Sequence, residues 1–272
     1  MVVAGCSQPA IALPPNTPAA ATVDGHDISM AAYEARLRVS QARDPFAAEA
    51  VPSPASSQRL EDFTVEQLIR EEIVRQLATP YGITISDQQL VTREAQLQAS
   101  AGTSSFRGAL TRNGFTAASF HDYERALLTE VALVHRLAKD RIAQAQKELA
   151  SGESFEAAVA KWNDDSGTSA AKGEAGWLRP GDLPEPSLRA AVDALAVGGL
   201  TGIVETERGL VIAKALDRRG DLVRLAVILV LAPTVDLFSP QATPAWFIKL
   251  VDDRESALKS QGKIVIRVGS SS

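Results

Sequence analysis

The 272-residue chain has one cysteine, three histidines and few aromatic side chains, which make up 5% of its composition. A single cysteine can form no internal disulfide bond and cannot complete a Cys/His ligand set for structural zinc. We therefore predict no metal site, and stability has to come from packing. Because alanine is abundant and aromatic residues are scarce, we expect a core of aliphatic side chains and closely packed helices.

The chain also lacks clusters of basic residues, glycine-rich phosphate loops and long apolar runs. Its net charge is −5, which argues against nucleic acid as a partner because phosphate binding needs a concentrated basic surface. Without a phosphate loop we expect neither a nucleotide nor another cofactor. The most apolar run, Leu225 to Ala232, is far shorter than the roughly 20 residues that span a bilayer.

The cysteine lies in a motif near the start of the sequence. Val3-Ala4-Gly5-Cys6 resembles the bacterial lipobox, in which the cysteine is lipidated and becomes the mature N-terminus. A signal peptide needs an apolar stretch of about 7–15 residues before this point, so we expect the reading frame to begin upstream of Met1. The alternative is a chance motif of small residues. Residues 7–21 are rich in proline and alanine, which is typical of a tether.

The first half of the chain is expected to be mainly helical. A turn at Asp24-Gly25 follows a short strand, and Ser29 can cap the first helix. Residues 44–62 contain three prolines and several serines, and they read as a loop. A second helix is predicted from about Phe63, since its apolar residues recur every four positions and form one face.

Further helices follow this one. Ser86 and Gln89 have the spacing of a capping box, and Gly102 is expected to end that helix. Thr116 can cap a long helix that ends near Ala150. At the other end of the chain, a helix is expected before a turn at Gly262, with a strand from Ile264 to Val268.

This order of elements resembles the N-terminal chaperone region of SurA/PrsA-type periplasmic foldases. The stretches that carry the resemblance are "VDGHDIS", "EQLIREEIVRQLATPYGITISDQQL", "LTRNGFTAASFHDYERALLTEVALVHRLA" and, at the C-terminus, "TPAWFIKLVDDRESALKSQGKIVIRV". The resemblance implies an α+β fold: a mostly helical SurA/trigger-factor-like chaperone domain with a small parvulin-like α/β domain inserted. The expected divisions are residues 1–21 (leader remnant and tether), 22–145 (chaperone domain), 146–232 (inserted domain), 233–268 (helix and strand completing the chaperone domain) and 269–272 (tail).

The inserted part resembles the parvulin, or PpiC-type, rotamase domain. Lys172-Gly173-Glu174-Ala175-Gly176-Trp177 matches the glycine-rich step of that family with one glycine replaced, and residues 198–202 and 205–209 match its strand pair. Isomerisation at proline passes a barrier of roughly 18–20 kcal/mol but breaks no bond. An apolar pocket with polar groups that favour the twisted amide would therefore be enough.

Several family positions are altered in this chain. By the resemblance, Asp165 takes the place of the catalytic acid or thiol, and Leu183 and Leu188 replace the Met and Phe of the proline pocket. The two histidines of the family fall on Val211 and Val227, so this parvulin domain is degenerate. The predicted substrate-binding residues are Leu178, Leu183, Leu188, Val192, Val211 and Val227. A structural role for Asp164-Asp165, and a core role for Leu183 and Leu188, remain open.

The first parvulin strand is absent before the helix at Ala143. We expect residues 225–231 to replace it by pairing with residues 210–216, through circular permutation. The resemblance implies an extracytoplasmic, lipid-anchored foldase that binds unfolded or proline-containing secreted polypeptides, with isomerase activity weak or lost. The alternatives are an active isomerase, which would use Asp165 and the apolar pocket, and an assembly scaffold lipoprotein with one fixed partner.

Overall fold

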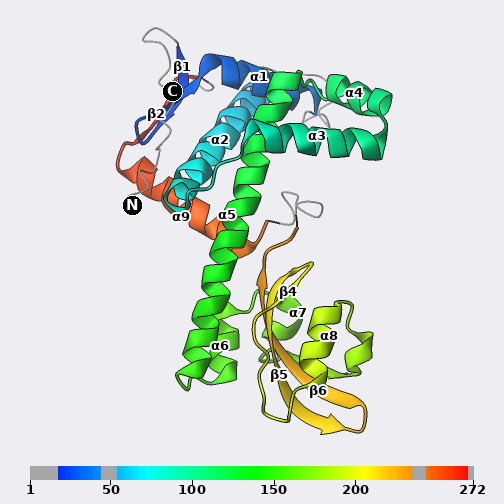
Figure 1. The fold of residues 1–272 in the computed structure, drawn as a ribbon. Coiled ribbons are helices and arrows are strands. Elements are labelled where there is room, and N and C mark those ends of the chain that lie inside the picture. Colours follow the sequence, from blue (N-terminus) through cyan, green and yellow to red (C-terminus); the bar gives the residue numbers. More distant parts are fainter. Residues whose placement is uncertain (1–17, 44–53, 235–242, 269–272) are drawn as a thin grey trace, which may run out of the picture. The chain divides into compact units, whose positions relative to one another are not determined.

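The computed structural model describes residues 18–43, 54–234 and 243–268. The chain divides into two compact units, each with its own small antiparallel sheet (Figure 1). The first unit comprises Met1–Thr79, Thr84–Ala126 and Asp253–Ser272, and the second comprises Pro80–Ile83 and Leu127–Asp252. Helices predominate and the sheets are small, which confirms the predicted α+β class.

A three-stranded sheet in the first unit joins the two ends of the chain. Its order is β2-β1-β7, with β1 at Ala19–Val23, β2 at His26–Ser29 and β7 at Ile264–Ile266. The predicted turn at Asp24-Gly25 is confirmed, since both residues have positive φ angles, as the tight turn of a two-residue hairpin requires. β7 runs antiparallel to β1, with Ile266 opposite Ala21. The last strand therefore completes a sheet that the first strands begin.

The helix starts that were predicted for the first unit are confirmed, with one exception. Ser29 accepts a hydrogen bond from the Ala32 amide at the start of α1, and Ser86 and Gln89 form the predicted capping box of α3. The exception is α2, which begins at Pro54 rather than near Phe63. Proline is well tolerated in the first turn of a helix. The bounds are α1 Met30–Ala42, α2 Pro54–Ala78, η1 Thr79–Tyr81 and α3 Asp87–Ala101.

Three further helices follow, which are α4, α5 and, near the C-terminus, α9. α4 (Thr103–Arg112) was not predicted; it buries Phe106, whose ring meets that of Phe120 edge-on at 5.5 Å. α5 (Ala117–Ala150) is unbroken and starts after Thr116, whose hydroxyl accepts the Ser119 amide. α9 spans Ala245–Ser260. Among the residues that the structure describes, no helix combines the length and apolar composition needed to cross a membrane.

The sheet of the second unit has four antiparallel strands in the order β3-β6-β5-β4. Two of them, β5 and β6, form a long hairpin in which Leu210 faces Val230 and Ala213 faces Val227. This pairing confirms the prediction that residues 225–231 lie beside residues 210–216. The bounds are α6 Phe155–Trp162, α7 Ser166–Ser169, β3 Glu174–Leu178, η2 Pro180–Asp182, α8 Pro186–Asp193, β4 Val204–Thr206, β5 Gly209–Arg219 and β6 Leu222–Leu231.

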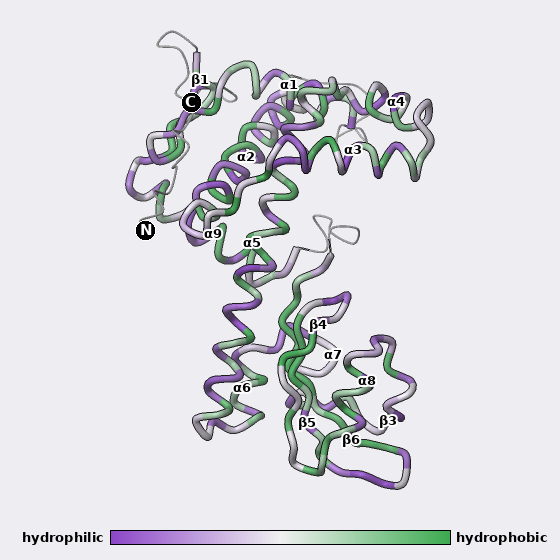
Figure 2. Tube along the Cα trace, viewed as in Figure 1, coloured by the Kyte–Doolittle hydropathy of each residue, from purple (hydrophilic) through white to green (hydrophobic). Residues whose placement is uncertain are grey.

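β6 is apolar on both faces because helices cover the sheet on both sides (Figure 2). One face carries Leu225 and Leu229, which pack with Leu188 and Val192 of α8. On the other face α6 packs against β6, and its Phe155 ring lies under the Lys214 ammonium of β5 at 5.5 Å. A strand buried on both faces is a near-continuous apolar run, which explains the composition of residues 222–231.

Glu148 links the end of α5 to α6. Its carboxylate accepts hydrogen bonds from Lys161 (2.7 Å), the Trp162 indole (2.8 Å) and Gln144 (3.1 Å). These donors, Lys161 first and Trp162 next, hold the pKa of Glu148 at about 2, below its ordinary value of 4.5. The carboxylate therefore stabilises the fold above about pH 4.5, and this contribution is lost as the pH falls towards 2.

We expect Glu148→Gln to lower the melting temperature at pH 6, with a deficit that shrinks below pH 4.5 and vanishes near pH 2. Thermal unfolding followed by circular dichroism across this range measures the deficit. The control is Glu156→Gln, since Glu156 is exposed on the same helix pair. A deficit for Glu148→Gln that is constant from pH 6 to pH 2 would contradict the ionic origin of the effect.

Candidate functional site

All six residues predicted to bind substrate meet on the α8 face of the four-stranded sheet. Leu188 and Val192 come from α8, Val211 from β5 and Val227 from β6, where each strand turns alternate side chains to this face. Leu178 at the end of β3 and Leu183 after η2 pack against the same cluster. The substitutions that make the family pattern degenerate are therefore neighbours in one apolar cluster.

Burial divides these six residues into two groups. Leu188, Val192 and Val211 are buried, with exposed fractions of 6%, 0% and 6%. Leu178, Leu183 and Val227 are only partly buried. A polypeptide that docked on this face would touch the second group, whereas the first group forms the core beneath it.

Asp165 lies at the start of α7 and is held by two side chains. Its carboxylate accepts a hydrogen bond from the Thr168 hydroxyl at 2.8 Å and forms an ion pair with Arg208 at 3.0 Å. Partial burial alone would raise the pKa of Asp165, but the bonds from Thr168 and Arg208 outweigh it and leave the pKa below its ordinary value. The group is therefore an anion at neutral pH and acts as an acceptor rather than as a proton donor.

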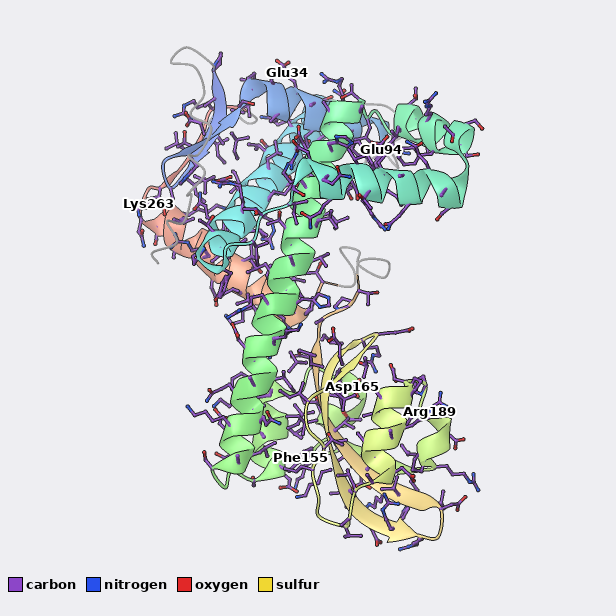
Figure 3. All side chains as sticks on the ribbon, in the orientation of Figure 1. Glu34, Glu94, Phe155, Asp165, Arg189 and Lys263 are labelled. Carbon is purple, nitrogen blue, oxygen red and sulfur yellow. The ribbon has the colours of Figure 1, made fainter. Side chains whose placement is uncertain are left out.

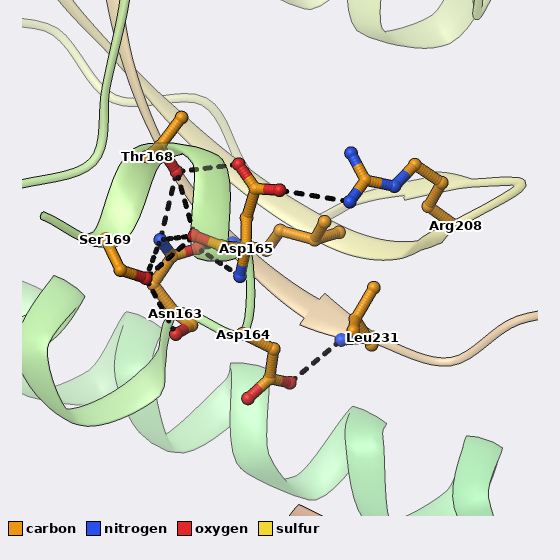
Figure 4. A network of polar contacts seen from close by, with 8 residues as sticks. Asn163, Asp164, Asp165, Thr168, Ser169, Arg208 and Leu231 are labelled. Atoms are coloured by element: carbon orange, nitrogen blue, oxygen red, sulfur yellow. Dashed lines mark hydrogen bonds and ion pairs between the residues drawn. The ribbon is translucent and has the colours of Figure 1, made fainter. Parts of the chain in front are cut away.

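The residues just before Asp165 complete the edge of β6 (Figure 4). Asn163 accepts the Leu229 amide at 2.9 Å through its side-chain oxygen, and the Asp164 carboxylate accepts the Leu231 amide at 2.9 Å. The Asp164 amide in turn donates to the Leu229 carbonyl at 2.8 Å. β3 pairs with β6 only as far as Ala226, so these groups replace the missing strand. Asp164 has this structural role, which the sequence left open.

Arg141 binds the same loop from α5. Its guanidinium lies 3.2 Å from the Asp164 carboxylate and stacks on two indoles, 5.4 Å from the Trp162 ring centre and 4.8 Å from that of Trp246. Burial raises the pKa of Asp164, against the opposing effects of the Leu231 amide and Arg141. Two of the three tryptophans are thus used in packing. Trp177 on β3 is 37% exposed and carries Arg219 on its ring at 4.5 Å.

The glycine-rich step contains two successive residues with positive φ angles. Gly173 has a φ of 86° and is buried between α6 and β6, where its carbonyl accepts the Val227 amide. Lys172, which stands where the family pattern has a glycine, has a φ of 55°. Side chains disfavour this left-handed region by roughly 1–2 kcal/mol. A left-handed turn is therefore formed here although only the second of its two residues is a glycine.

We expect Lys172→Gly to raise the free energy of unfolding by up to about 1 kcal/mol, because it removes the left-handed strain but adds flexibility to the unfolded chain. Urea unfolding, followed by tryptophan fluorescence, measures the change. Lys172→Ala is the control, since it removes the ammonium and keeps the Cβ atom. Equal gains from both variants would assign the effect to charge rather than to the backbone.

The three histidines are engaged away from the apolar cluster. The His26 ring contacts the Asp24 carbonyl at 3.2 Å, and the His121 ring contacts the Glu94 carboxylate at 2.7 Å. The His135 ring contacts the Pro233 carbonyl at 2.9 Å. No imidazole of this chain therefore takes over from the two family histidines, whose places the resemblance assigns to Val211 and Val227.

Two family models match the chain. A model of the SurA-like N-terminal domain matches residues 3–133, and a model of the PPIC-type PPIASE (rotamase) domain matches residues 132–217. The second match ends before β6, although β6 lies inside the sheet. Together the two models account for both resemblances that the sequence showed.

The chain is also similar to individual proteins. Chaperone SurA of Chromohalobacter salexigens is 39% identical over 74 residues, which are 27% of this chain and 17% of the relative, so the match spans about a sixth of that protein. PrsA, a peptidylprolyl isomerase of Bacillus anthracis, is 15% identical, with 73% of this chain and 88% of that chain covered and a TM-score of 0.24. A SurA-like chaperone structure of Campylobacter jejuni is 12% identical, with 92% and 98% covered and a TM-score of 0.32.

Proposed function

The chain combines a SurA-like N-terminal domain with a PPIC-type domain, and we propose that it is a protein-folding factor that acts outside the cytoplasm. It would bind unfolded or proline-containing secreted polypeptides reversibly and without a nucleotide. The observation that carries this proposal is the presence of both domains in one chain. The partly exposed apolar surface formed by Leu178, Leu183 and Val227 supports it.

We propose that isomerase activity is weak or lost. Catalysis here requires polar groups that stabilise the twisted amide more than the planar one. Val211 and Val227 stand where the family has imidazoles, and they offer no such group. Asp165, the proposed catalytic residue, already accepts hydrogen bonds from Thr168 and Arg208. What remains is an apolar surface that can hold a chain without twisting it.

We further propose that β6 replaces the first parvulin strand through circular permutation. It pairs antiparallel with β5, the last strand of the family pattern, and it lies beyond the residues that the PPIC-type model matches. On this basis we assign residues 146–232 to the parvulin-like domain. The chaperone domain would consist of residues 22–145 and 233–268, with β7 paired to β1 as its closing element.

The proposed site of action rests on Cys6. Lipidation at this cysteine would anchor the protein to a membrane on its extracytoplasmic side, with the following residues as a tether. Cys6 lies outside the described residues, so the anchor stays a prediction. Mass spectrometry of the protein from its native membrane tests it, because lipidation would add mass to Cys6, and cleavage of the peptide bond before Cys6 would make this residue the N-terminus.

Suppression of client aggregation tests the folding function. We expect the protein to slow the aggregation of several unrelated unfolded proteins, and Leu183→Asp to weaken this effect by placing a charge on the apolar surface. Val197→Asp is a matched control, since Val197 is an exposed apolar residue (58%) outside the cluster. Protection of a single partner alone would favour an assembly scaffold, and no protection of any client would contradict the proposal.

A further inference from the structure

β7 is an edge strand, and among the described residues the outward backbone groups of Ile264 and Ile266 have no strand partner. In the sheet order β2-β1-β7 it has a neighbour on one side only, among the strands that the structure describes. The Lys263 carbonyl accepts the Asp24 amide, and the Arg267 amide donates to the Ala20 carbonyl, both at 2.8 Å. Because the direction alternates along a strand, the backbone groups of Ile264 and Ile266 point away from β1.

The same strand exposes apolar side chains on both faces. Ile266 lies opposite Ala21, which is fully buried, yet Ile266 is 46% exposed. On the other face Val265 is 45% exposed. Natural edge strands are usually protected by charges that point inward, by proline or by bulges. β7 is short and is flanked by Lys263 and Arg267, but its own three residues, Ile264 to Ile266, are all apolar and contain no bulge.

Basic residues flank this apolar strand. Lys263 binds Asp24 at 2.8 Å, and Arg254 binds the same carboxylate at 3.0 Å. Arg267 donates to the neutral Thr22 hydroxyl at 2.7 Å. Lys263 lies directly before the strand (Figure 3), and Arg267 directly follows it in the sequence. Lys263 and Arg254 thus share Asp24, and Arg267 reaches a second carboxylate, Asp27, only through the Thr22 hydroxyl, which donates to it at 2.6 Å. Three cations stand against two carboxylates at this edge, so the local charge is positive although the chain is acidic overall.

These charges decide which partner fits. If two copies paired antiparallel along the whole of β7, Ile264 would face Ile266 and Lys263 would face Arg267. Like charges directly opposite each other are destabilising. A strand with acidic residues around an apolar centre would instead complete the backbone hydrogen bonds and extend the apolar face. Its carboxylates would lie opposite Lys263 and Arg267.

We infer that the outer edge of β7 binds an extended polypeptide segment by strand addition, and that it selects apolar segments flanked by acidic residues. Backbone hydrogen bonds would give the affinity, and the flanking charges would give the selectivity. The identification of this segment as part of an unfolded client rests on the proposed function. The edge would then be a second client contact, apart from the apolar cluster of the four-stranded sheet.

A fluorescein-labelled peptide with alternating valine and threonine between aspartates tests this inference, with fluorescence anisotropy on the full chain. Ile266→Pro removes the outward amide and leaves the pairing with β1 intact, whereas the control Ile266→Ala keeps the amide. We expect the proline variant to bind roughly five- to tenfold more weakly than the alanine variant, the effect of losing one hydrogen bond. Equal affinities would overturn the inference.

Reversing the charges of the peptide or of the strand edge tests the inferred selectivity independently. The same peptide with lysine flanks is expected to bind more weakly than the aspartate peptide, and Lys263→Glu with Arg267→Glu is expected to reverse this order. If the order of the two peptide affinities does not change, or if sedimentation shows a dimer joined at β7, the inferred preference for acidic flanks is contradicted. If Ile266→Pro does not fold, the aspartate peptide methylated on alternate backbone nitrogens replaces it, and undiminished binding in both methylation registers would overturn strand addition.

Aggregation assays separate the two proposals. If the wild-type chain protects no client, the folding function fails, and the peptide experiment still decides whether the edge of β7 binds strands. If the wild-type chain protects clients while Ile266→Pro and Ile266→Ala bind the peptide equally, only the strand-addition inference fails.

Discussion

Replacing Gly173 by alanine is expected to lower the free energy of unfolding by about 3 kcal/mol or more. A Cβ atom at this position would lie 2.7 Å from a methyl group of Val159 and 2.7 Å from the Val227 carbonyl oxygen. The φ of 86° adds left-handed strain. Gly173 is packed between α6 and β6, so neither Val159 nor the backbone of Val227 can move without disturbing the core.

Gly176→Ala is the matched control for this substitution. Gly176 has nearly the same φ, 85°, but an added Cβ would meet no atom within 4 Å. Its expected cost is the left-handed strain alone, roughly 1–2 kcal/mol. All three tryptophans lie in the second unit, so urea unfolding followed by their fluorescence reports on it. Equal costs for the two variants would show that Gly173 is not closely packed.

Asn163→Ala is expected to cost about 2–4 kcal/mol, because it removes several hydrogen bonds and leaves a buried amide without a partner. The amide is that of Leu229, whose residue is 4% exposed and which donates to the Asn163 side chain. The same side chain donates to the Thr168 hydroxyl at 3.1 Å and to the Asp165 carbonyl at 3.3 Å. Urea unfolding measures the cost.

Ser169→Ala is the control in the same loop. The Ser169 hydroxyl donates to the Asp165 carbonyl at 2.7 Å and accepts the Asn163 side-chain amide at 3.1 Å, but it makes no bond to β6, and its residue is exposed. We expect a cost below about 1 kcal/mol. If Asn163→Ala were as mild as Ser169→Ala, the loop would not be what completes the edge of β6.

Short-range signals in the sequence predicted much of the fold. Ser29, Ser86 and Gln89 cap helices as expected, since a cap depends only on residues three positions apart. The pairing of β5 with β6 was instead implied by the resemblance to the parvulin domain, in which residues 225–231 take the place of the missing first strand beside the last one. The start of α2 at Pro54 was missed because proline and serine are common both in loops and in the first turn of a helix.

The candidate site was predictable in part. Family positions brought Leu183, Val211 and Val227 together in one cluster, but they could not show that Val211 is buried while Leu183 and Val227 are partly exposed. The sequence also gave no sign that Asn163 and Asp164 complete β6, because the two segments are far apart in the chain. An acidic pair after a helix is equally typical of a solvated loop.

The central claim is that the PPIC-type domain holds proline-containing chains without accelerating isomerisation. Exchange NMR spectroscopy of a labelled proline peptide tests this directly, since one experiment reports both binding and the rate of cis–trans exchange. The account predicts that resonances shift as the protein is added, while exchange stays on the unaided timescale of roughly 10–100 s. Exchange that quickens in proportion to the protein, and that Asp165→Asn abolishes, would contradict it.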